Sequence, residues 1–254
     1  MSADLLEQVA KWLAGAKTAV AFTGAGISTE SGIPDFRSPG GVWATNRQIY
    51  YDEFLESESA RYEYWRQKAI AHGDFTTSSP NAGHLTLAKW QAAGFLGTVV
   101  TQNIDGLHQD AGSQDVIEIH GTARFIRCLD CNSRYDAGPL VEQFEADDAV
   151  PPCPDCEHGR LKHDTISFGQ SLNPEVLDRA VQLSGGADVF VALGSSLVVE
   201  PAASLPRLAK QNGARLVIIN RDPTPLDAIA DAIFNDGIGT VVTQIDQMIK
   251  NDES

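Results

Sequence analysis

Residues 23–37 read Thr23-Gly24-Ala25-Gly26-Ile27-Ser28-Thr29-Glu30-Ser31-Gly32-Ile33-Pro34-Asp35-Phe36-Arg37, and this stretch decides the fold. Residues 18–22 before it are apolar and partly β-branched, which predicts a buried first strand. Gly24 and Gly26 permit a tight turn into a helix, with a backbone that can approach a pyrophosphate closely. The amides and dipole at the start of such a helix favour an anionic ligand. The stretch therefore predicts a nucleotide-binding turn.

The rest of the stretch supplies groups that a nucleotide can contact. Pro34 stiffens the loop, Asp35 brings a carboxylate, and Phe36 and Arg37 bring an aromatic plane and a fixed cation. An ordinary dinucleotide dehydrogenase is disfavoured, since Thr29 replaces the third glycine of G-x-G-x-x-G and no clear strand ending in an acidic residue follows about 20 residues later. From the two glycines alone, a turn without chemical meaning is the alternative.

Composition places the chain among water-soluble globular proteins. Its 254 residues can bury a full core in one large domain, alone or with a small insert. Hydrophobic residues make up 43% and charged residues 21% of the chain. The net charge of -15 argues against nonspecific nucleic-acid binding, which needs a basic surface. It is compatible with a basic partner such as a lysine-rich peptide, although a solvated acidic surface is the favoured explanation.

The N-terminal residues carry no positive segment followed by an apolar core, so we expect no signal peptide. Nothing approaches the length of an apolar membrane span, and we expect a cytoplasmic protein without membrane contact. In that compartment the four cysteines need a role other than disulfides.

Predicted strands alternate with predicted helices along the chain. Strands are expected at 18–22, 97–101, 116–119, 188–193 and 215–219, with a last apolar segment at 232–237. Helices are expected at 5–14, near 57–71, after 81–84 and at 241–249. Such alternation predicts an α/β fold with a parallel sheet and helices on both faces. Polar or glycine residues follow strand after strand, and ligands bind at that carboxyl edge in open α/β sheets.

The cysteines form two pairs, Cys128-x-x-Cys131 and Cys153-x-x-Cys156, with residues 132–152 between them. Each two-residue gap lets a turn aim both thiolates at one metal, so we expect a tetrahedral zinc site. Four sulfur ligands leave no open coordination position, and the ion is therefore expected to be structural. Disulfides or idle thiols are the alternatives. His158 and His163 are interpreted as surface histidines.

Two further candidate sites follow strands. Gln102-Asn103-Ile104-Asp105 offers amides and a carboxylate that can bind a carboxamide and ribose hydroxyls, although a polar turn at Asp105 is the alternative. His120, just before the cysteine insert, is a candidate general base because its ordinary pKa lies close to working pH. His84 and His108 are weaker candidates, and His84 is expected to help start its helix.

These motifs together resemble one family, the sirtuins, over almost the whole chain. The segments that carry the resemblance are Gly24-Ala25-Gly26-Ile27-Ser28, Gly32-Ile33-Pro34-Asp35-Phe36-Arg37, Thr101-Gln102-Asn103-Ile104-Asp105, His120-Gly121, the two cysteine pairs, Phe168-Gly169 and Gly194-Ser195-Ser196-Leu197. Their order resembles that of bacterial or archaeal single-domain sirtuins, which are NAD-dependent protein lysine deacylases.

The resemblance implies a Rossmann-like large domain at about 1–37, 80–123 and 169–254 of a catalytic domain spanning residues 1–254. It implies a small domain made of a helical module at about 38–79 and a zinc module at about 124–168. NAD and the acyl-lysine of a protein or peptide would meet in the cleft between them. The products would be lysine, nicotinamide and O-acyl-ADP-ribose.

The resemblance also implies the residues of the site. His120 and Asn103 would be catalytic. NAD would contact Gly24, Ala25, Gly26, Thr29, Asp35, Phe36, Arg37, Gln102, Asn103, Ile104, Asp105, Gly194, Ser195, Ser196, Asn220, Arg221, Gly237 and Ile238. The peptide would add as an extended strand at Ile166, Phe168, Gly169, Val198 and Val199. One structural zinc would bind Cys128, Cys131, Cys153 and Cys156.

Acyl preference depends on a Tyr-x-x-Arg pair that desuccinylating sirtuins carry. Here Trp65 stands three residues after Tyr62, and Arg66 comes one position late. We therefore expect acetyl or another uncharged acyl group to be preferred over succinyl. The alternatives to a deacylase are a mono-ADP-ribosyltransferase on the same scaffold and an NAD-sensing binding module.

Overall fold

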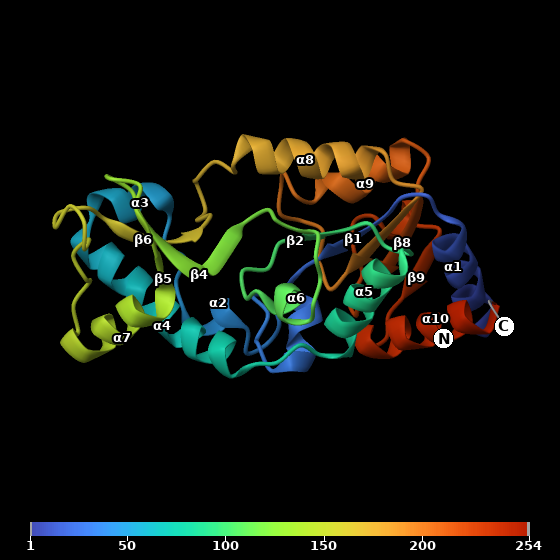
Figure 1. Cartoon of the computed structure of the whole chain (residues 1–254), viewed down its shortest axis with the longest axis horizontal. Helices are drawn as coiled ribbons and strands as arrows, with labels where there is room; N and C mark the ends of the chain where they lie inside the picture. The colour runs from blue at the N-terminus through green and yellow to red at the C-terminus, as the bar shows by residue number, and fades with distance from the viewer. Residues whose placement is uncertain (1, 253–254) are drawn as a thin grey trace.

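A six-stranded sheet forms the centre of the protein, whose computed structural model describes residues 2–252 (Figure 1). The strands are β1 (Ala19–Thr23), β2 (Thr98–Thr101), β3 (Val116–Glu118), β7 (Val189–Leu193), β8 (Arg215–Ile219) and β9 (Ala232–Phe234). Their order is β3-β2-β1-β7-β8-β9, and every adjacent pair is parallel. The predicted parallel sheet is confirmed. Every residue of β1, β2 and β7 is buried, as expected for a sheet covered on both faces.

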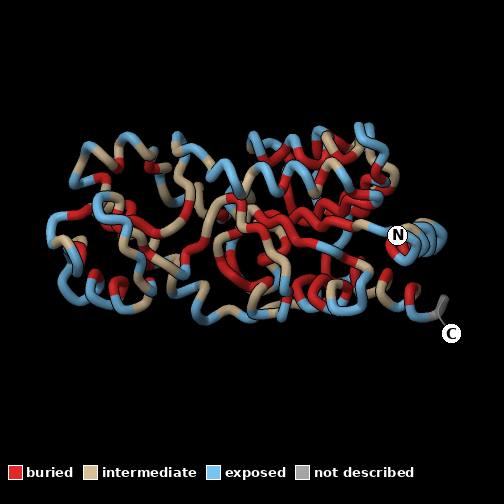
Figure 2. The backbone as a smooth tube through the Cα atoms, turned by 45° about the horizontal axis from the view of Figure 1, so that its top comes forward, coloured by how far each residue is buried: buried red, intermediate tan, exposed pale blue. Residues whose placement is uncertain are grey.

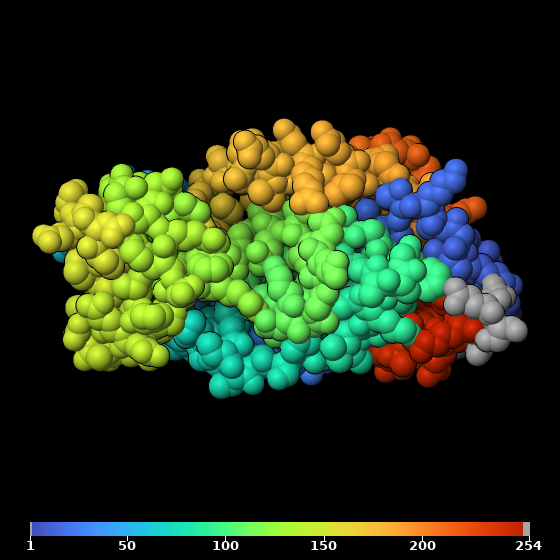
Figure 3. All heavy atoms as spheres, in the orientation of Figure 1, coloured from blue at the N-terminus to red at the C-terminus, as the bar shows by residue number. Residues whose placement is uncertain are grey.

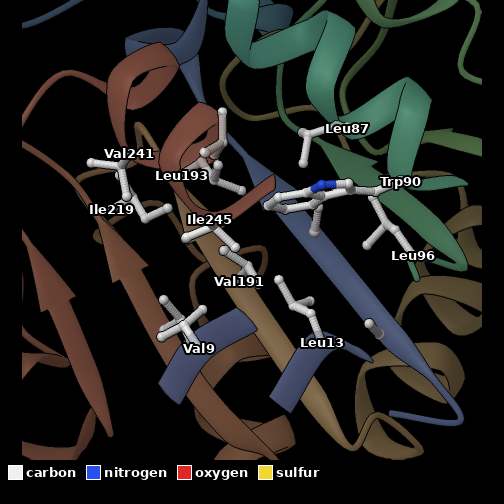
Figure 4. Packing of buried hydrophobic residues seen from close by; sticks show 14 of the residues in the cluster. Val9, Leu13, Leu87, Trp90, Leu96, Val191, Leu193, Ile219, Val241 and Ile245 are labelled. Atoms are coloured by element: carbon white, nitrogen blue, oxygen red, sulfur yellow. The ribbon is translucent and has the colours of Figure 1, made fainter. Parts of the chain in front are cut away.

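Helices cover both faces of this sheet. One face carries α1 (Ala3–Gly15), α5 (Ala82–Ala93) and α10 (Ile238–Asp252), and the other carries α8 (Pro174–Gly185) and α9 (Ser204–Gln211). On the first face, Val9 and Leu13 of α1 and Ile245 of α10 gather over Val191 of the sheet (Figure 4). Figure 2 shows the buried residues concentrated along the strands and the inward sides of the helices.

A local signal explains where α5 starts. The Asn81 side chain accepts hydrogen bonds from the Gly83 and His84 amides, and the His84 ring accepts one from the Asn81 amide, so α5 begins with a capping box. The expectation that His84 helps start its helix is confirmed. After β1 the chain forms a 3₁₀ helix, η1 (Ala25–Ser31), and not the α-helix that the glycine turn suggested.

A second body lies at one end of the molecule. Its elements are α2 (Val42–Thr45), α3 (Tyr51–Glu56), α4 (Glu58–Thr77), β4 (Gly121–Cys128), β5 (Arg134–Asp136), α7 (Ala137–Asp147) and β6 (Leu161–Thr165). The strands form an antiparallel sheet in the order β5-β4-β6. Figure 3 shows its yellow-green residues at the end away from the blue and red terminal helices. The sequence patterns did not predict α7.

One hydrophobic core joins the two chain segments of this body. Phe54 and Trp65 come from the first segment, and Ile126, Phe144 and Leu161 come from the second. We propose the division into large and small domains on this packing. The remaining short elements are α6 (Leu107–Asp110) and η2 (Asp227–Ile229). Within residues 2–252, no helix combines the length and apolar character needed to cross a bilayer.

Candidate active site

The site lies where the strand order reverses, between β1 and β7. Gly24 N donates to Leu193 O (3.0 Å), and Gly26 N donates to Gly194 O (2.8 Å), so the turns after the two strands contact each other directly. A Cβ on Gly26 would lie 2.7 Å from Gly194 Cα. Gly194 itself has φ +62°, a conformation that favours glycine. The glycines are thus needed to bring two loops together at the switch point, where α/β sheets bind their ligands.

A cleft of about 1420 Å³ opens at this edge of the sheet. All the residues expected to contact NAD, from Gly24 to Ile238, line it, and so does His120. Among the expected peptide contacts, Ile166, Phe168, Gly169 and Val199 line the cleft, whereas Val198 does not and is 51% exposed. A typical single-ligand pocket measures roughly 300–1,000 Å³. The cleft therefore has room for two ligands.

His120 occupies the short link between β3 and β4. Its Nδ1 lies 3.1 Å from Gln102 O. Since a carbonyl oxygen only accepts, Nδ1 carries the hydrogen, and the neutral ring keeps a lone pair on Nε2. Burial lowers the pKa of His120 below its usual 6.5, against the opposing effect of the Gln102 hydrogen bond. The ring is therefore neutral at pH 7, with Nε2 ready to accept a proton.

A buried hydrogen-bond network fixes the segment after β2. Asn103 Nδ2 donates to Gly24 O (3.1 Å) and to Ser28 Oγ (3.1 Å), and Ser28 Oγ donates to Asp105 Oδ2 (2.7 Å). The other carboxylate oxygen, Asp105 Oδ1, accepts from Leu107 N (3.0 Å). Sequence reasoning did not assign Ser28 to the site, although its position inside the glycine motif was a usable signal. The network fixes Asn103 and Asp105 before any ligand arrives.

The Asp35 side chain stabilises the loop at residues 35–38. Its Oδ1 accepts from Arg37 N (3.0 Å) and Ser38 N (2.8 Å), which closes the turn. Burial raises the pKa of Asp35, but the hydrogen bonds from Ser38 and Arg37 outweigh that effect and leave it lowered. The carboxylate therefore stays charged and holds the loop in shape at neutral pH.

An aromatic series connects this loop with the predicted peptide segment. The Trp43 ring lies between Phe36 (5.5 Å between centroids) and Phe168 (5.8 Å), and the Arg37 guanidinium lies 4.4 Å from the Trp43 centroid. Phe36 and Phe168 are each 41% exposed. Trp43, which sequence reasoning did not assign, thus joins the two sides of the cleft.

Helix α4 forms another wall, and the structure shows which of its residues face the cleft. Tyr64, Gln67 and Lys68 line it, whereas Tyr62 and Arg66 do not. Tyr62 donates its hydroxyl to Asp148 and Arg66 forms a bidentate ion pair with Glu63, both outside the cleft. Burial lowers the pKa of Lys68 to about 8. Sequence reasoning did not assign Lys68, because no local pattern shows which face of α4 turns toward the cleft.

The four cysteines fit a tetrahedral metal site. Their Sγ atoms all lie within 4.8 Å of one another, with Cys128 and Cys156 3.8 Å apart and Cys131 and Cys153 3.6 Å apart. Zinc–sulfur bonds of about 2.3 Å place tetrahedral sulfurs about 3.8 Å apart, whereas a disulfide needs about 2.05 Å. The predicted zinc ligands therefore match the donor geometry of zinc, and the cysteines are free of disulfides.

One expectation about neighbouring histidines is wrong. His163 is 2% exposed and packs against Trp65 (5.4 Å between centroids) and Tyr64 (6.1 Å). Its position on β6 turns the ring into the core of the small body, which the sequence around it did not reveal. His158 is exposed, as expected.

Comparison with known proteins identifies the family. The Sir2 family model matches residues 24–201, and the chain belongs to the Sir2 family. NAD-dependent protein deacetylase 1 of Bradyrhizobium diazoefficiens is 48% identical over 236 residues, 92% of each chain. NAD-dependent protein deacylase 2 of Pyrobaculum aerophilum is 40% identical over 252 residues, 95% of each chain.

Solved structures agree with the fold. A Sir2 complex with p53 peptide and NAD⁺ superposes with a TM-score of 0.88 at 35% identity, covering 98% of this chain and 99% of that one. A Sir2 variant with deacetylated p53 peptide and 3′-O-acetyl-ADP-ribose has a TM-score of 0.89 at 36% identity, covering 95% of this chain and 97% of that one. The predicted Rossmann-like fold with a small zinc-binding body is confirmed.

Proposed function

We propose that this chain is an NAD-dependent protein lysine deacylase acting mainly on acetyl-lysine, with lysine, nicotinamide and O-acyl-ADP-ribose as products. The observation that carries the proposal is His120, a neutral base with a fixed tautomer in a two-ligand cleft at the sheet's switch point. The names of the relatives and the ligands of the solved Sir2 complexes support it.

Different residues of the cleft are assigned to different parts of the ligands. NAD would supply the ribose carbon to which the acyl oxygen of the substrate bonds as nicotinamide leaves, and water would finally release the free lysine. Asp105 and the Ile104 backbone hold the carboxamide, and Asn103 and Gln102 hold the adjoining ribose. His120 Nε2 accepts the proton of a ribose hydroxyl, so that the oxygen can attack the acyl carbon.

The remaining NAD contacts follow the strand ends. The diphosphate is assigned to the amides of the first turn, from Gly24 to Thr29, and to Gly194, Ser195 and Ser196. Asn220 and Arg221 are assigned to the adenosine ribose, and Gly237 and Ile238 to the adenine. Asp35, Phe36 and Arg37 form the loop over the ligand, and Arg37 adds a cation near the diphosphate. Excluding bulk water protects the reaction from hydrolysis.

The peptide is proposed to add as an extended strand between the segments at 166–169 and 198–199. Ile166 N donates to His120 O (2.8 Å), so the first segment is tied to the catalytic histidine by its backbone. Exposed Phe168 and Val198 offer side-chain contacts on the two sides of the strand. The net charge of -15 favours a lysine-rich peptide over nucleic acid or a membrane surface, and cysteine usage favours the cytoplasm.

The acyl group is proposed to be uncharged. Arg66 is neutralised by Glu63, and Tyr62 is bound to Asp148, so neither reaches an acyl carboxylate in the cleft. Lys68 is a cation in the α4 wall, and it is the residue to vary. On one peptide sequence, acetyl should exceed succinyl in kcat/KM, and Lys68→Met should leave the acetyl value within about twofold. Desuccinylation equal to deacetylation would refute the acyl preference, and its loss in Lys68→Met would assign the carboxylate contact to Lys68.

The function is tested by nicotinamide release over peptides with varied acyl groups. Release should need both NAD and an acyl-peptide. His120→Ala should lower turnover by about 100-fold or more, because a positioned base contributes that much, with an unchanged melting temperature. Full turnover in His120→Ala would remove this base from the mechanism, and NAD binding without release over the whole panel would favour a sensing module.

A further inference from the structure

Two buried histidines behind the cleft have one ring nitrogen each without a partner among the described residues. His84 is 0% and His108 1% exposed, and their ring centroids lie 4.8 Å apart. The nitrogens in question are His84 Nε2 and His108 Nδ1. Buried polar atoms are nearly always hydrogen bonded, so this pair requires an explanation.

The known partners fix both tautomers. His84 Nδ1 accepts from Asn81 N (3.4 Å), so the neutral ring carries its hydrogen on Nε2. Thr23 Oγ1 donates its single proton to Thr101 Oγ1 (2.8 Å), so it accepts from His108 Nε2 at 2.9 Å. Neutral His108 then has a lone pair on Nδ1. The unpartnered atoms are therefore one donor and one acceptor.

Both rings are neutral at physiological pH, as this assignment requires. Burial lowers the pKa of His84 to about 4, although the Asp105 charge acts in the opposite direction. Burial lowers the pKa of His108 to about 3, and His84 adds to the effect. The two rings make a T-shaped contact, with an interplanar angle of 63°.

The histidine pair connects η1 with the end of β1. On one side, Asn81, which bonds His84, also donates from Nδ2 to Ile27 O (2.7 Å) in η1. On the other side, His108 bonds Thr23 at the end of β1. Thr101 continues the series, accepting from Thr23 and from Asn103 N (3.0 Å).

We propose that His84 and His108 are positioning residues for Asn103: His84 Nε2–H and His108 Nδ1 are bridged by one buried water, which completes a polar chain from η1 to the segment after β2. The chain holds the Asn103 backbone, while Ser28 and Gly24 O hold its side chain. The functional part of this inference rests on the proposed function, since Asn103 is assigned to the ribose there. The tautomer part rests on the hydrogen bonds alone.

The first test is imidazole ¹⁵N NMR of the wild-type protein at pH 7. Both rings should be the Nε2–H tautomer. A protonated Nδ1 on His108, or a charged ring at either position, would overturn the proposal. This NMR measurement needs no substrate, so it tests the tautomers even if the wild-type protein does not release nicotinamide. Failure to release nicotinamide would contradict the proposed function and not the tautomer assignment.

The second test is a double-mutant cycle with NAD, an acetyl-lysine peptide and labelled nicotinamide. His84→Leu and His108→Leu should each lower kcat for nicotinamide exchange by about tenfold or more, because misplacement of reacting groups is costly, with the peptide KM unchanged. The double variant should lose no more than the worse single variant. Leu87→Ala, on the same helix and buried in the core, is the control for destabilisation alone. The proposal would be overturned if the loss of kcat in the double variant equalled the product of the two single losses. It would also be overturned if the histidine variants, like the control, had a lowered melting temperature and a normal kcat.

Discussion

One hydrogen bond decides how His120 can act. The carbonyl of Gln102 requires a hydrogen on Nδ1, which leaves Nε2 as the basic atom. Burial then keeps the ring unprotonated to a lower pH than an exposed histidine. Tautomer and charge state are thus set before substrate binds.

The pH profile of kcat/KM tests this state. A base must be neutral to act, and burial lowers the pKa of His120, so activity should persist as pH falls to 6.5 and decline only below it. An acid limb with an apparent pKa above 6.5, measured by nicotinamide release under peptide-limited conditions, would contradict the assignment. A peptide without titrating groups near pH 6 controls for substrate protonation.

Individual residues were predictable where a motif carried them. Asn103, Asp105 and His120 follow strands, and strand ends meet at one edge of a parallel sheet. Trp43 and Lys68 were not assigned, because their places in the cleft depend on contacts between segments far apart in the chain. Ser28 was not assigned either, although it lies inside the glycine motif. The burial of His163 was missed for the same reason as Trp43 and Lys68, because Trp65 of α4 covers the His163 ring and no local sequence pattern indicates this contact.

At the scale of elements, the turns after β1 and β7 depend on each other. The backbone hydrogen bond from Gly26 N to Gly194 O requires the two loops to touch, and there is no space for a side chain between them. Sequence reasoning assigned the glycines to ligand approach. Their contact with a second loop became visible only with the sheet order.

Gly26→Ala should therefore be destabilising and should weaken NAD binding. Its Cβ would lie 2.7 Å from Gly194 Cα, and overpacking of this kind costs about 1–3 kcal/mol. Gly73→Ala in α4 is the matched control, since nothing lies within 4 Å of its Cβ. In a helix interior that change should stabilise by up to about 1 kcal/mol. Denaturant unfolding measures both, and equal effects of the two substitutions would contradict the packing interpretation.

The cysteine site should stabilise the small body in particular. Cys128 and Cys153 belong to its hydrophobic core, so loss of the ion exposes that core. Zinc analysis should give one ion per chain. Chelation should increase hydrogen exchange in β4, β6 and α7, while β1 and β7 stay protected. Unchanged exchange in β4 and β6 after complete zinc removal would show that the ion is not structural.

At the scale of the whole molecule, alternation of strands and helices predicted the parallel sheet and its ligand edge. The order β3-β2-β1-β7-β8-β9 places the first turn beside the fourth strand of the sheet, which is the Rossmann arrangement. Pattern alone did not reveal how Trp65 of one insertion packs with Phe144 of the other, because that core is nonlocal. The small body faces the ligand edge through Tyr64 and Thr165, and so the cleft has two walls.

The most direct test of the account is product analysis after reaction with NAD and an acetyl-lysine peptide. Mass spectrometry should find nicotinamide, deacetylated peptide and O-acetyl-ADP-ribose in equal amounts. ADP-ribose attached to protein or peptide, with the acetyl group still in place, would contradict the account and identify a mono-ADP-ribosyltransferase.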